Sequence, residues 1–579
     1  MRRNNFSFLI VLTAVFFIGI FFRSYNFTPW LHFELDQARD ALIIKAAIEN
    51  GAGDLPLLGP RAAGTILRLG PIFYYIQYVG AKIFGNTPQG IAYPTLLFSI
   101  FSLGIFYLFT RRYFEKSMAI GLTALFSCSL FLITYSRFAW NPNMLPFFGI
   151  LFFYSLLRIV DEDDKKRGWW LIISSVSLSF LVQFHFLALV AAPLIGIIFI
   201  SIKRPRINFL FWIASIFLFL FLNIPMIINE IKTGGDNSVQ FFSAITEKSD
   251  ETPKTLPEKI SENYLQHSSG YWTILTGSQD VVFFDIDFSS KEKIGFDIKC
   301  NQDCRDHLVK GMASFILLTL SIFSLIIALK TEKNITKKDF LTLNALWFSV
   351  VFVIFLPISF DLSPRFFLIS AAVPFVFLGL LIGEMTRLLK INKNIVGIIF
   401  VLIFVISNIV FDMRFFRQLS LAQSENIEIG TDKILKQKTR ITLKQQNEIA
   451  NLMENTYKNN GYPILFNAQS EFNRSLTFLL DMRKIPRDNI EKSKVYKNAN
   501  YFTVVRTQSD YDKYIRKYEK RFMIGEKKEF GTLTVYQLKQ KEEFITNQNI
   551  SKKSLVRDVS NYDSNKNAKR YMWREIFQK

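Results

Sequence analysis

The residues with the clearest potential for chemistry lie in one short polar stretch, from Glu34 to Ala41, directly after an apolar segment. On a helix that begins near Asp36, the side chains of Asp36, Arg39 and Asp40 share one face, because residues three and four positions apart are neighbours on a helix. One carboxylate could act as a general base, and the guanidinium of Arg39 could hold or neutralise an anion. The same residues could instead form only a helix N-cap and a surface ion pair.

The elements that must position this stretch are predominantly apolar. Half of the 579 residues are hydrophobic, yet the net charge is +21, so the chain combines membrane-spanning segments with charged aqueous parts, and a soluble single domain or a nucleic-acid-binding protein is excluded. A bilayer span needs about 20 mostly apolar residues, and about eleven segments satisfy this rule. They are Phe6–Phe22, Ile91–Phe109, Ser117–Tyr135, Met144–Val160, Trp169–Phe184, Phe186–Ile202, Phe209–Ile228, Gly311–Leu329, Phe340–Pro357, Phe366–Arg387 and Ile395–Phe411.

Lys and Arg residues concentrate in alternate loops between these segments, and basic loops face the cytoplasm. The sequence therefore predicts a multi-pass protein of the cell (plasma or inner) membrane with a cytoplasmic N-terminus. Residues 23–90 then form a first outer loop, residues 229–310 a large outer loop, and the C-terminal region also lies outside. The segment Pro71–Phe84 is short for a span, so we expect an interfacial or re-entrant helix; if it crosses the membrane, the number of spans rises to about twelve or more.

The C-terminal region has the pattern of a small, basic α/β domain over residues 412–540. Its apolar spacing predicts helices and strands in alternation, and residues 541–579 read as a loosely ordered polar tail. The predicted helices are Thr442–Tyr457 and Glu471–Met482, and the predicted strands are Pro463–Phe466, Tyr501–Val505 and Thr532–Leu538. The positive charge could contact anionic lipids or glycans, or could be only a solvated surface.

Only a few residues of the chain could ligate a metal ion in the predicted outer loops. His32, Glu34 and His185 could gather around a divalent cation, although their spacing matches no metal-ligand motif. Cys300 and Cys304, with His307, resemble half of a metal site; a short disulfide loop or unpaired thiols are the alternatives. We therefore predict no definite cofactor and leave a divalent metal open.

Further motifs follow in order along the chain, each near the outer end of a predicted span. They are Gly70-Pro71 before Tyr74-Tyr75, Ser136 to Asn143, Gln183-Phe184-His185 and Ser363-Pro364-Arg365-Phe366. Together with Asp36 to Ala41, they resemble the GT-C fold membrane glycosyltransferases of the protein O-mannosyltransferase and lipid A aminoarabinose transferase superfamily. The resemblance covers residues 1–411, and it implies an α-helical polytopic membrane protein with about 11–13 transmembrane helices. The extracytoplasmic α/β domain would follow it.

The resemblance implies a function for the first outer loop. A hexosyl or pentosyl group would pass from a polyprenyl-phosphate-linked donor to a hydroxyl of a lipid, polymer or protein acceptor, at the outer face of the membrane. Asp36 would be the general base of a single, inverting displacement. The expected donor-phosphate contacts are Arg365, Arg39, Arg61 and Arg137, and the expected substrate contacts are Asp40, Tyr74, Asn141, Asn143 and His185.

Two features bear on these assignments. Many relatives carry an Asp where this chain has Asn141 and Asn143, and an amide can form hydrogen bonds but cannot act as a base, which leaves Asp36 as the strong candidate. Arg365 opens a span at the depth of lipid headgroups, where it could contact a phosphate or simply extend its charge to the interface.

Two other functions suit a multi-pass chain with a basic outer surface. One is a transporter or flippase of lipid-linked sugars, and the other is a non-catalytic partner in glycan assembly. A transporter should place ionisable groups at mid-membrane depth, whereas the charges singled out above lie at the outer ends of the spans. This distribution favours an enzyme that works at one face.

Overall fold

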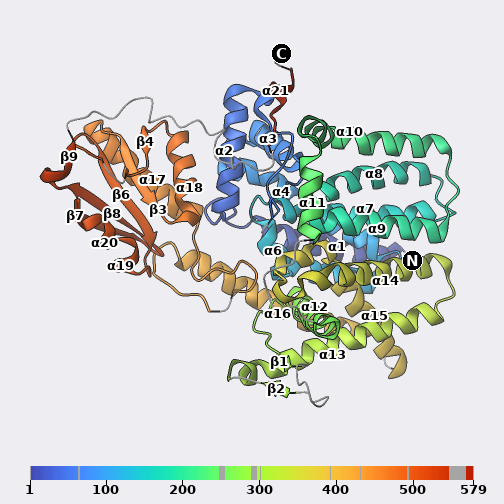
Figure 1. Ribbon diagram of the computed structural model, residues 1–579. Helices are drawn as coiled ribbons and strands as arrows, with labels where there is room; N and C mark the ends of the chain where they lie inside the picture. Colours follow the sequence, from blue (N-terminus) through green and yellow to red (C-terminus); the bar gives the residue numbers. More distant parts are fainter. Residues whose placement is uncertain are drawn as a thin grey trace.

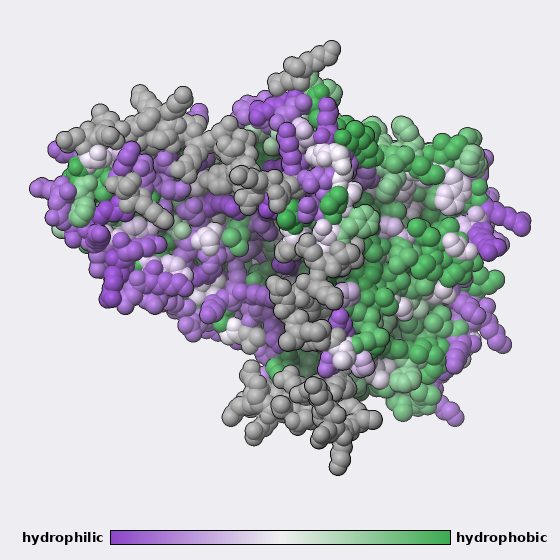
Figure 2. Space-filling model, in the orientation of Figure 1, coloured by the Kyte–Doolittle hydropathy of each residue, from purple (hydrophilic) through white to green (hydrophobic). Residues whose placement is uncertain are grey.

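The computed structural model describes residues 2–62, 65–246, 255–283, 285–287, 297–299, 302–390, 393–430, 432–491, 494–546 and 569–577. Its helices form a bundle, and a sheet-containing domain lies at the end of the bundle opposite the N-terminus (Figure 1). Figure 2 shows apolar surface over the bundle, with polar surface on the sheet domain and along the opposite edge. This distribution is that of a membrane protein with aqueous parts at both ends.

Eight helices of the described chain are long and apolar enough to cross a bilayer, and two bent pairs bring the number to ten. The eight lie in α1 (Arg2–Ser24), α4 (Pro88–Thr110), α7 (Leu145–Val160) with the preceding turn from Asn141, α9 (Phe186–Lys203), α10 (Phe209–Thr233), α13 (Gln302–Thr331), α14 (Ile335–Phe355) with the following turn to Ile358, and α16 (Lys393–Leu421). The bent pairs are α5 (Lys116–Cys128) with α6 (Leu130–Ser136), at 53°, and η4 (Pro364–Ser370) with α15 (Val373–Leu388), at 66°.

The remaining segment that we expected to span, Trp169–Phe184, lies in α8 (Arg167–Phe184). This helix packs between α7 and α10, but four serines and Gln183 make it less apolar than its neighbours. The segment Pro71–Phe84 contains the helix α3 (Ile72–Phe84), whose 13 residues are too few for a span, as predicted.

The break between α5 and α6 differs from the continuous span that the sequence predicts. The buried Arg23 donates to the carbonyl of Ser127 at 2.7 Å, and the side-chain oxygen of Asn408 accepts from the amide of Leu130 at 2.9 Å. A broken helix is tolerated inside a membrane protein only where other groups satisfy the freed backbone. Arg23 and Asn408 do so here.

The end of the bundle away from the N-terminus is built from short elements between the spans. They are α2 (Leu35–Asn50), η1 (Ala52–Asp54), η2 (Asn141–Met144), α11 (Asp236–Thr246), α12 (Leu256–Thr276), the antiparallel strands β1 (Asp285–Asp287) and β2 (Asp297–Lys299), and η3 (Leu356–Asp361). The helix α12, predicted as part of a polar loop, buries His267 and Tyr271 against the bundle. Cys300 and the side chain of Cys304 lie outside the described residues.

The C-terminal domain contains a five-stranded mixed sheet in the order β4–β3–β6–β8–β7. Strands β4, β3 and β6 are parallel, and β8 pairs antiparallel with both β6 and β7. The strands of this sheet are β3 (Ile464–Ala468), β4 (Arg487–Asp488), β6 (Asn500–Arg506), β7 (Phe522–Phe530) and β8 (Leu533–Gln540). The helices of the domain are α17 (Leu443–Asn460), α18 (Ser470–Met482), α19 (Tyr511–Tyr514), α20 (Arg516–Glu519) and η5 (Glu542–Phe544). A separate parallel pair joins β5 (Val495–Tyr496) to β9 (Ile545–Thr546). The predicted α/β character is confirmed.

Two boundaries differ from the expectation. The helix α16 continues to Leu421, ten residues beyond the predicted end at Phe411. Residues 569–577, which we expected in a loosely ordered tail, contain α21 (Trp573–Phe577) and pack on the first outer loop. There the amide of Leu57 donates to the carbonyl of Tyr571 at 2.9 Å, and the indole of Trp573 donates to the hydroxyl of Tyr75 at 2.9 Å.

Candidate active site

The first turns of α2 bring Asp36, Arg39 and Asp40 together as the spacing predicts. Arg39 Nη1 donates to Asp36 Oδ1 at 2.9 Å, while its Nη2 and Nε donate to Asp40 Oδ1 at 2.7 and 2.9 Å. The Asp40 side chain is fully buried, whereas 42% of the Asp36 side chain is exposed. One carboxylate is therefore an internal partner of Arg39, and the other can reach a ligand from outside.

Burial and neighbouring charges shift the pKa values of the Asp40 carboxyl and the Arg39 guanidinium. Burial raises the pKa of Asp40 to about 6, even though the adjacent Arg39 lowers it. Burial also disfavours the charged form of Arg39, but the charges of Asp40, Tyr74 and Asp36 outweigh this and raise the pKa of the guanidinium. At neutral pH the buried Asp40 carboxyl is therefore mainly ionised beside the Arg39 guanidinium.

The start of α2 is fixed by a capping box that the sequence analysis missed. Glu34 is the N-cap residue, its side chain accepts from the backbone of Gln37, and the Gln37 side chain accepts from the backbone amide of Glu34. Such a box satisfies two backbone donors that a helix start otherwise leaves without partners. The spacing of an acid and a Gln three residues apart was the signal that could have revealed it.

Trp140, from the second outer loop, links Asp36 to a distant arginine. Its indole Nε1 donates to Asp36 Oδ2 at 3.2 Å, and the guanidinium of Arg365 lies over the Trp140 ring, 5.3 Å from the centroid. Arg365 also lies 5.4 Å from the ring centroid of Phe366, its chain neighbour. An exposed carboxylate and a half-buried cation thus contact the same indole, from two separate loops.

Two more of the predicted substrate residues lie close to this group. His185 is the N-cap residue of α9; its Nδ1 accepts from the amide of Leu187 at 3.2 Å, and its ring packs against Phe366. Burial, with a smaller contribution from the charge of Arg365, lowers the pKa of His185 to about 3, so the imidazole is neutral. Tyr74 is fully buried on α3, near enough to Arg39 and Asp40 to interact electrostatically with both.

The other predicted residues have structural contacts in this state. Arg137 is buried and donates to the carbonyls of Phe22, Arg23 and Tyr25 at 2.8–3.1 Å, which fixes the end of α1. The side-chain amides of Asn141 and Asn143 donate to main-chain carbonyls at 2.6 and 2.9 Å and hold the second outer loop.

Arg61 lies elsewhere in the first outer loop. Its backbone forms a short antiparallel bridge with that of Arg68, and within the described part of the chain no contact joins it to Asp36 or Arg39.

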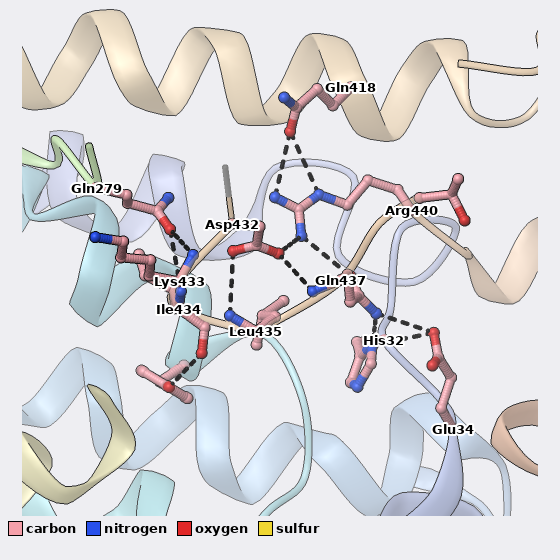
Figure 3. Close-up of polar contacts among 12 residues, drawn as sticks. His32, Glu34, Gln279, Gln418, Asp432, Lys433, Ile434, Leu435, Gln437 and Arg440 are labelled. Atoms are coloured by element: carbon pink, nitrogen blue, oxygen red, sulfur yellow. Dashed lines mark hydrogen bonds and ion pairs between the residues drawn. The ribbon is translucent and has the colours of Figure 1, made fainter. Parts of the chain in front are cut away.

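A polar network joins the start of α2 to the segment that follows α16 (Figure 3). Gln437 Nε2 donates to Glu34 Oε1 at 3.2 Å, and His32 Nδ1 lies 3.4 Å from the same oxygen. Arg440 binds Gln437 Oε1 at 3.0 Å and forms a buried ion pair with Asp432 at 2.5 Å. Glu34 and Gln437 lie 403 positions apart, which explains why no sequence pattern revealed this contact.

This network also sets the charge state of the N-cap residue. Burial alone would raise the pKa of Glu34, but His32, Arg506 and Arg440 outweigh it and lower that pKa. Ionised Glu34 accepts the hydrogen bonds described above, so the C-terminal region supports the helix that carries Asp36.

No group of three or more His, Cys, Asp or Glu side chains that could hold a metal ion occurs among the described residues. His32 and Glu34 are adjacent, but His185 lies at the start of α9 beside Arg365 and does not join them.

The chain was compared with known families and structures. A family model described as dolichyl-phosphate-mannose-protein mannosyltransferase matches residues 69–228, from the loop before α3 into α10. The fold is similar to that of ArnT from Cupriavidus metallidurans in the apo state, with a TM-score of 0.50 and 12% identity over 95% of this chain and 100% of that chain. The same protein bound to undecaprenyl phosphate gives a TM-score of 0.50 and 12% identity over 93% and 98% of the two chains.

The archaeal oligosaccharyltransferase AglB from Archaeoglobus fulgidus has a TM-score of 0.48 and 11% identity over 87% of this chain and 70% of that chain. No curated protein sequence matches the chain. The family match and the fold shared with ArnT confirm the resemblance that the sequence motifs carry.

Proposed function

We propose, on the premise that this chain has the GT-C fold, that it is a membrane glycosyltransferase that uses a polyprenyl-phosphate-linked sugar donor. The observation that carries the proposal is the half-exposed carboxylate of Asp36, held by Arg39 and Trp140, with Arg365 against the same indole ring. The match to the mannosyltransferase family model and the undecaprenyl phosphate in the ArnT structure support the class of donor.

The proposed reaction is a single displacement. Asp36 takes the proton of an acceptor hydroxyl, and the oxygen attacks the anomeric carbon of the donor sugar. The bond from that carbon to the phosphate oxygen breaks, and polyprenyl phosphate leaves with the electron pair, so the anomeric configuration inverts. Catalysis needs a base near the acceptor and positive charge near the departing phosphate. Asp36 and Arg365 supply these two groups.

The neighbouring residues have distinct proposed roles. Arg39 positions Asp36 and balances the buried charge of Asp40, which makes both of them positioning residues. His185 uses Nδ1 to accept from a backbone amide, so its proton is on Nε2, which can donate to a sugar or phosphate oxygen. Tyr74 supports Arg39 and Asp40 from α3.

The other residues that we expected to contact substrate have mainly structural roles. Asn141, Asn143 and Arg137 shape the second outer loop and the end of α1. Arg61 would meet a donor phosphate only if the first outer loop rearranges, because it lies on the bridge with Arg68.

The proposed orientation follows from the basic loops. The N-terminus faces the cytoplasm, and the active site and the α/β domain over residues 412–540 face the outside of the cell membrane. The acceptor is a hydroxyl of a lipid, a polymer or a protein, and the donated sugar is a hexosyl or pentosyl unit.

The test uses purified protein in sealed proteoliposomes with a polyprenyl-phosphate donor labelled in the sugar, and membrane extracts as the source of acceptor. Wild-type protein should move label onto an acceptor, and Asp36→Asn should abolish this transfer. Glu49→Gln is the matched control, because Glu49 lies on the same helix and its side chain, which pairs with Lys45, is 54% exposed. Movement of labelled donor between leaflets without any transfer would contradict the proposal and identify a flippase.

A further inference from the structure

An apolar cavity of about 1040 Å³ lies at the end of the bundle that holds the N-terminus, away from Asp36. Two of its walls are α1, with Phe8 and Val11, and α16, with Ile398 and Leu402. These four side chains are also exposed on the outside of the bundle, among the residues of the apolar band. The cavity therefore opens sideways toward the hydrocarbon of the membrane.

The same two helices contact each other at their other ends. The ring centroid of Phe416, on α16, lies 6.0 Å from that of Phe22 on α1 and 5.5 Å from that of Trp30. Because α1 and α16 also pack on α5, the space between them is a groove that is closed toward the active site and open toward the N-terminal side. A flexible apolar chain that enters from the side fits this shape.

Four glycines line the groove, and the space over three of them, Gly121, Gly379 and Gly397, is filled by neighbouring side chains, whereas Gly383 on α15 leaves part of the floor open. A Cβ built on Gly383 would have no neighbour within 4 Å. Protein interiors are close-packed, and apolar walls without neighbouring atoms lose dispersion contacts. In a bilayer the surrounding lipid supplies those atoms.

The mouth of the groove carries charges at the level of the basic loops. Arg387, at the end of α15, pairs with Glu384 at 2.5 Å, and Lys337, near the start of α14, lies 5.7 Å from the ring centroid of Tyr113. The Arg387 side chain remains about half exposed in its ion pair. Two cations, Lys337 and Arg387, and two carboxylates, Glu115 and Glu384, line this mouth, which matches the phosphate and the ammonium of a zwitterionic phospholipid headgroup.

We propose that this groove binds a glycerophospholipid from the leaflet on the N-terminal side, with one acyl chain between α1 and α16 and its phosphate near Lys337 and Arg387. The sugar donor proposed above is a different lipid, since its phosphate is assigned to Arg365 at the opposite end. The bound phospholipid would hold α1 and α16 apart at one end while Phe22 and Phe416 hold them together at the other.

The test uses full-length protein in nanodiscs of phosphatidylethanolamine and phosphatidylglycerol that include a phosphatidylethanolamine with a photoreactive diazirine and an alkyne on one acyl chain. After irradiation, peptides that line the groove on α1, α5 or α16 should carry the label. Gly383→Phe should lower this labelling about tenfold, because filling the floor removes the apolar contacts that several chain carbons make. Gly104→Phe is the matched control, since Gly104 on α4 also faces open space but does not line the groove.

A second arm keeps the test decisive if Gly383→Phe fails to fold. The double variant Lys337→Gln/Arg387→Gln changes only the mouth, and it should lower the labelling of the same peptides severalfold. Unchanged labelling in either folded variant would overturn the proposal. Labelling of the groove by a photoreactive polyprenyl phosphate, with none by the phospholipid, would also overturn it and assign the groove to the donor lipid.

Discussion

Arg39 is predicted to matter for stability far more than Asp36, although the two form one cluster. The Asp40 side chain is fully buried and the Arg39 side chain is 15% exposed, so Arg39→Gln leaves a buried charge without its partner. Breaking such a pair costs about 3–5 kcal/mol of unfolding free energy. The pair of Arg39 with the half-exposed Asp36 is worth about 1 kcal/mol or less, so Asp36→Asn should barely change stability.

The assay is thermal unfolding of purified protein in detergent, followed by tryptophan fluorescence. Arg39→Gln should unfold well below wild type, and Arg39→Gln/Asp40→Asn should recover most of the loss, because the second substitution removes the unpaired charge. Asp36→Asn should unfold at the same temperature as wild type. Equal stability of Arg39→Gln and wild type, or a loss in Asp36→Asn as large as in Arg39→Gln, would refute the division of roles.

The pH dependence of the same variants follows from the pKa of Asp40, which is raised from 3.8 to about 6. The folded chain holds this proton more tightly than the unfolded chain, so the group favours the folded state at low pH, and this contribution is lost as the pH rises through about 6. The deficit of Arg39→Gln should therefore be smaller at pH 5 than at pH 7.5. A deficit of the same size at both pH values would contradict the assignment to Asp40.

Three further predictions concern other contacts of the site and of the tail. Trp140→Phe keeps an aromatic ring under Arg365 but removes the hydrogen bond to Asp36. It should lower kcat about fivefold with little change in KM for the donor. An unchanged kcat would show that Trp140 does not position Asp36. Arg365→Gln should lower kcat by about 100-fold or more, and Arg365→Lys should restore part of it, because the departing phosphate needs positive charge; equal rates in all three would exclude this contact. Trp573→Phe removes the hydrogen bond to Tyr75 and should lower the free energy of unfolding by about 1 kcal/mol, measured by thermal unfolding. The kinetics of sugar transfer should stay those of wild type. A wild-type melting curve would show that this contact does not stabilise the protein.

The parts of the site that sequence could predict are local. The face shared by Asp36, Arg39 and Asp40 follows from helical periodicity, because the three residues lie within five positions of one another. The contacts of Trp140 and Gln437 join residues 104 and 403 positions apart, and no periodic pattern encodes such pairs. The motifs indicated which loops meet, but only the fold shows which atoms do.

The fold was predictable where the length and the pattern of apolar segments determine the secondary structure. The spans and the α/β elements appear close to their predicted positions because bilayer thickness and alternation of side chains constrain them strongly. The α5–α6 break was not predictable, because its freed backbone is satisfied by Arg23 and Asn408 from distant helices. The extension of α16 was not predictable either, because it carries Phe416, whose ring packs on Trp30 in the first outer loop, and Phe415, whose ring lies against Arg440.

The central claim is that Asp36 is the base of a sugar transfer from a polyprenyl-phosphate donor. The most direct measurement is the single-turnover rate of label transfer by Asp36→Asn, compared with Asp36→Glu and Glu49→Gln, in protein whose thermal unfolding matches wild type. The account predicts a loss of about 1000-fold or more in Asp36→Asn, partial activity in Asp36→Glu and wild-type activity in Glu49→Gln. Transfer by Asp36→Asn at a rate near that of wild type would contradict it.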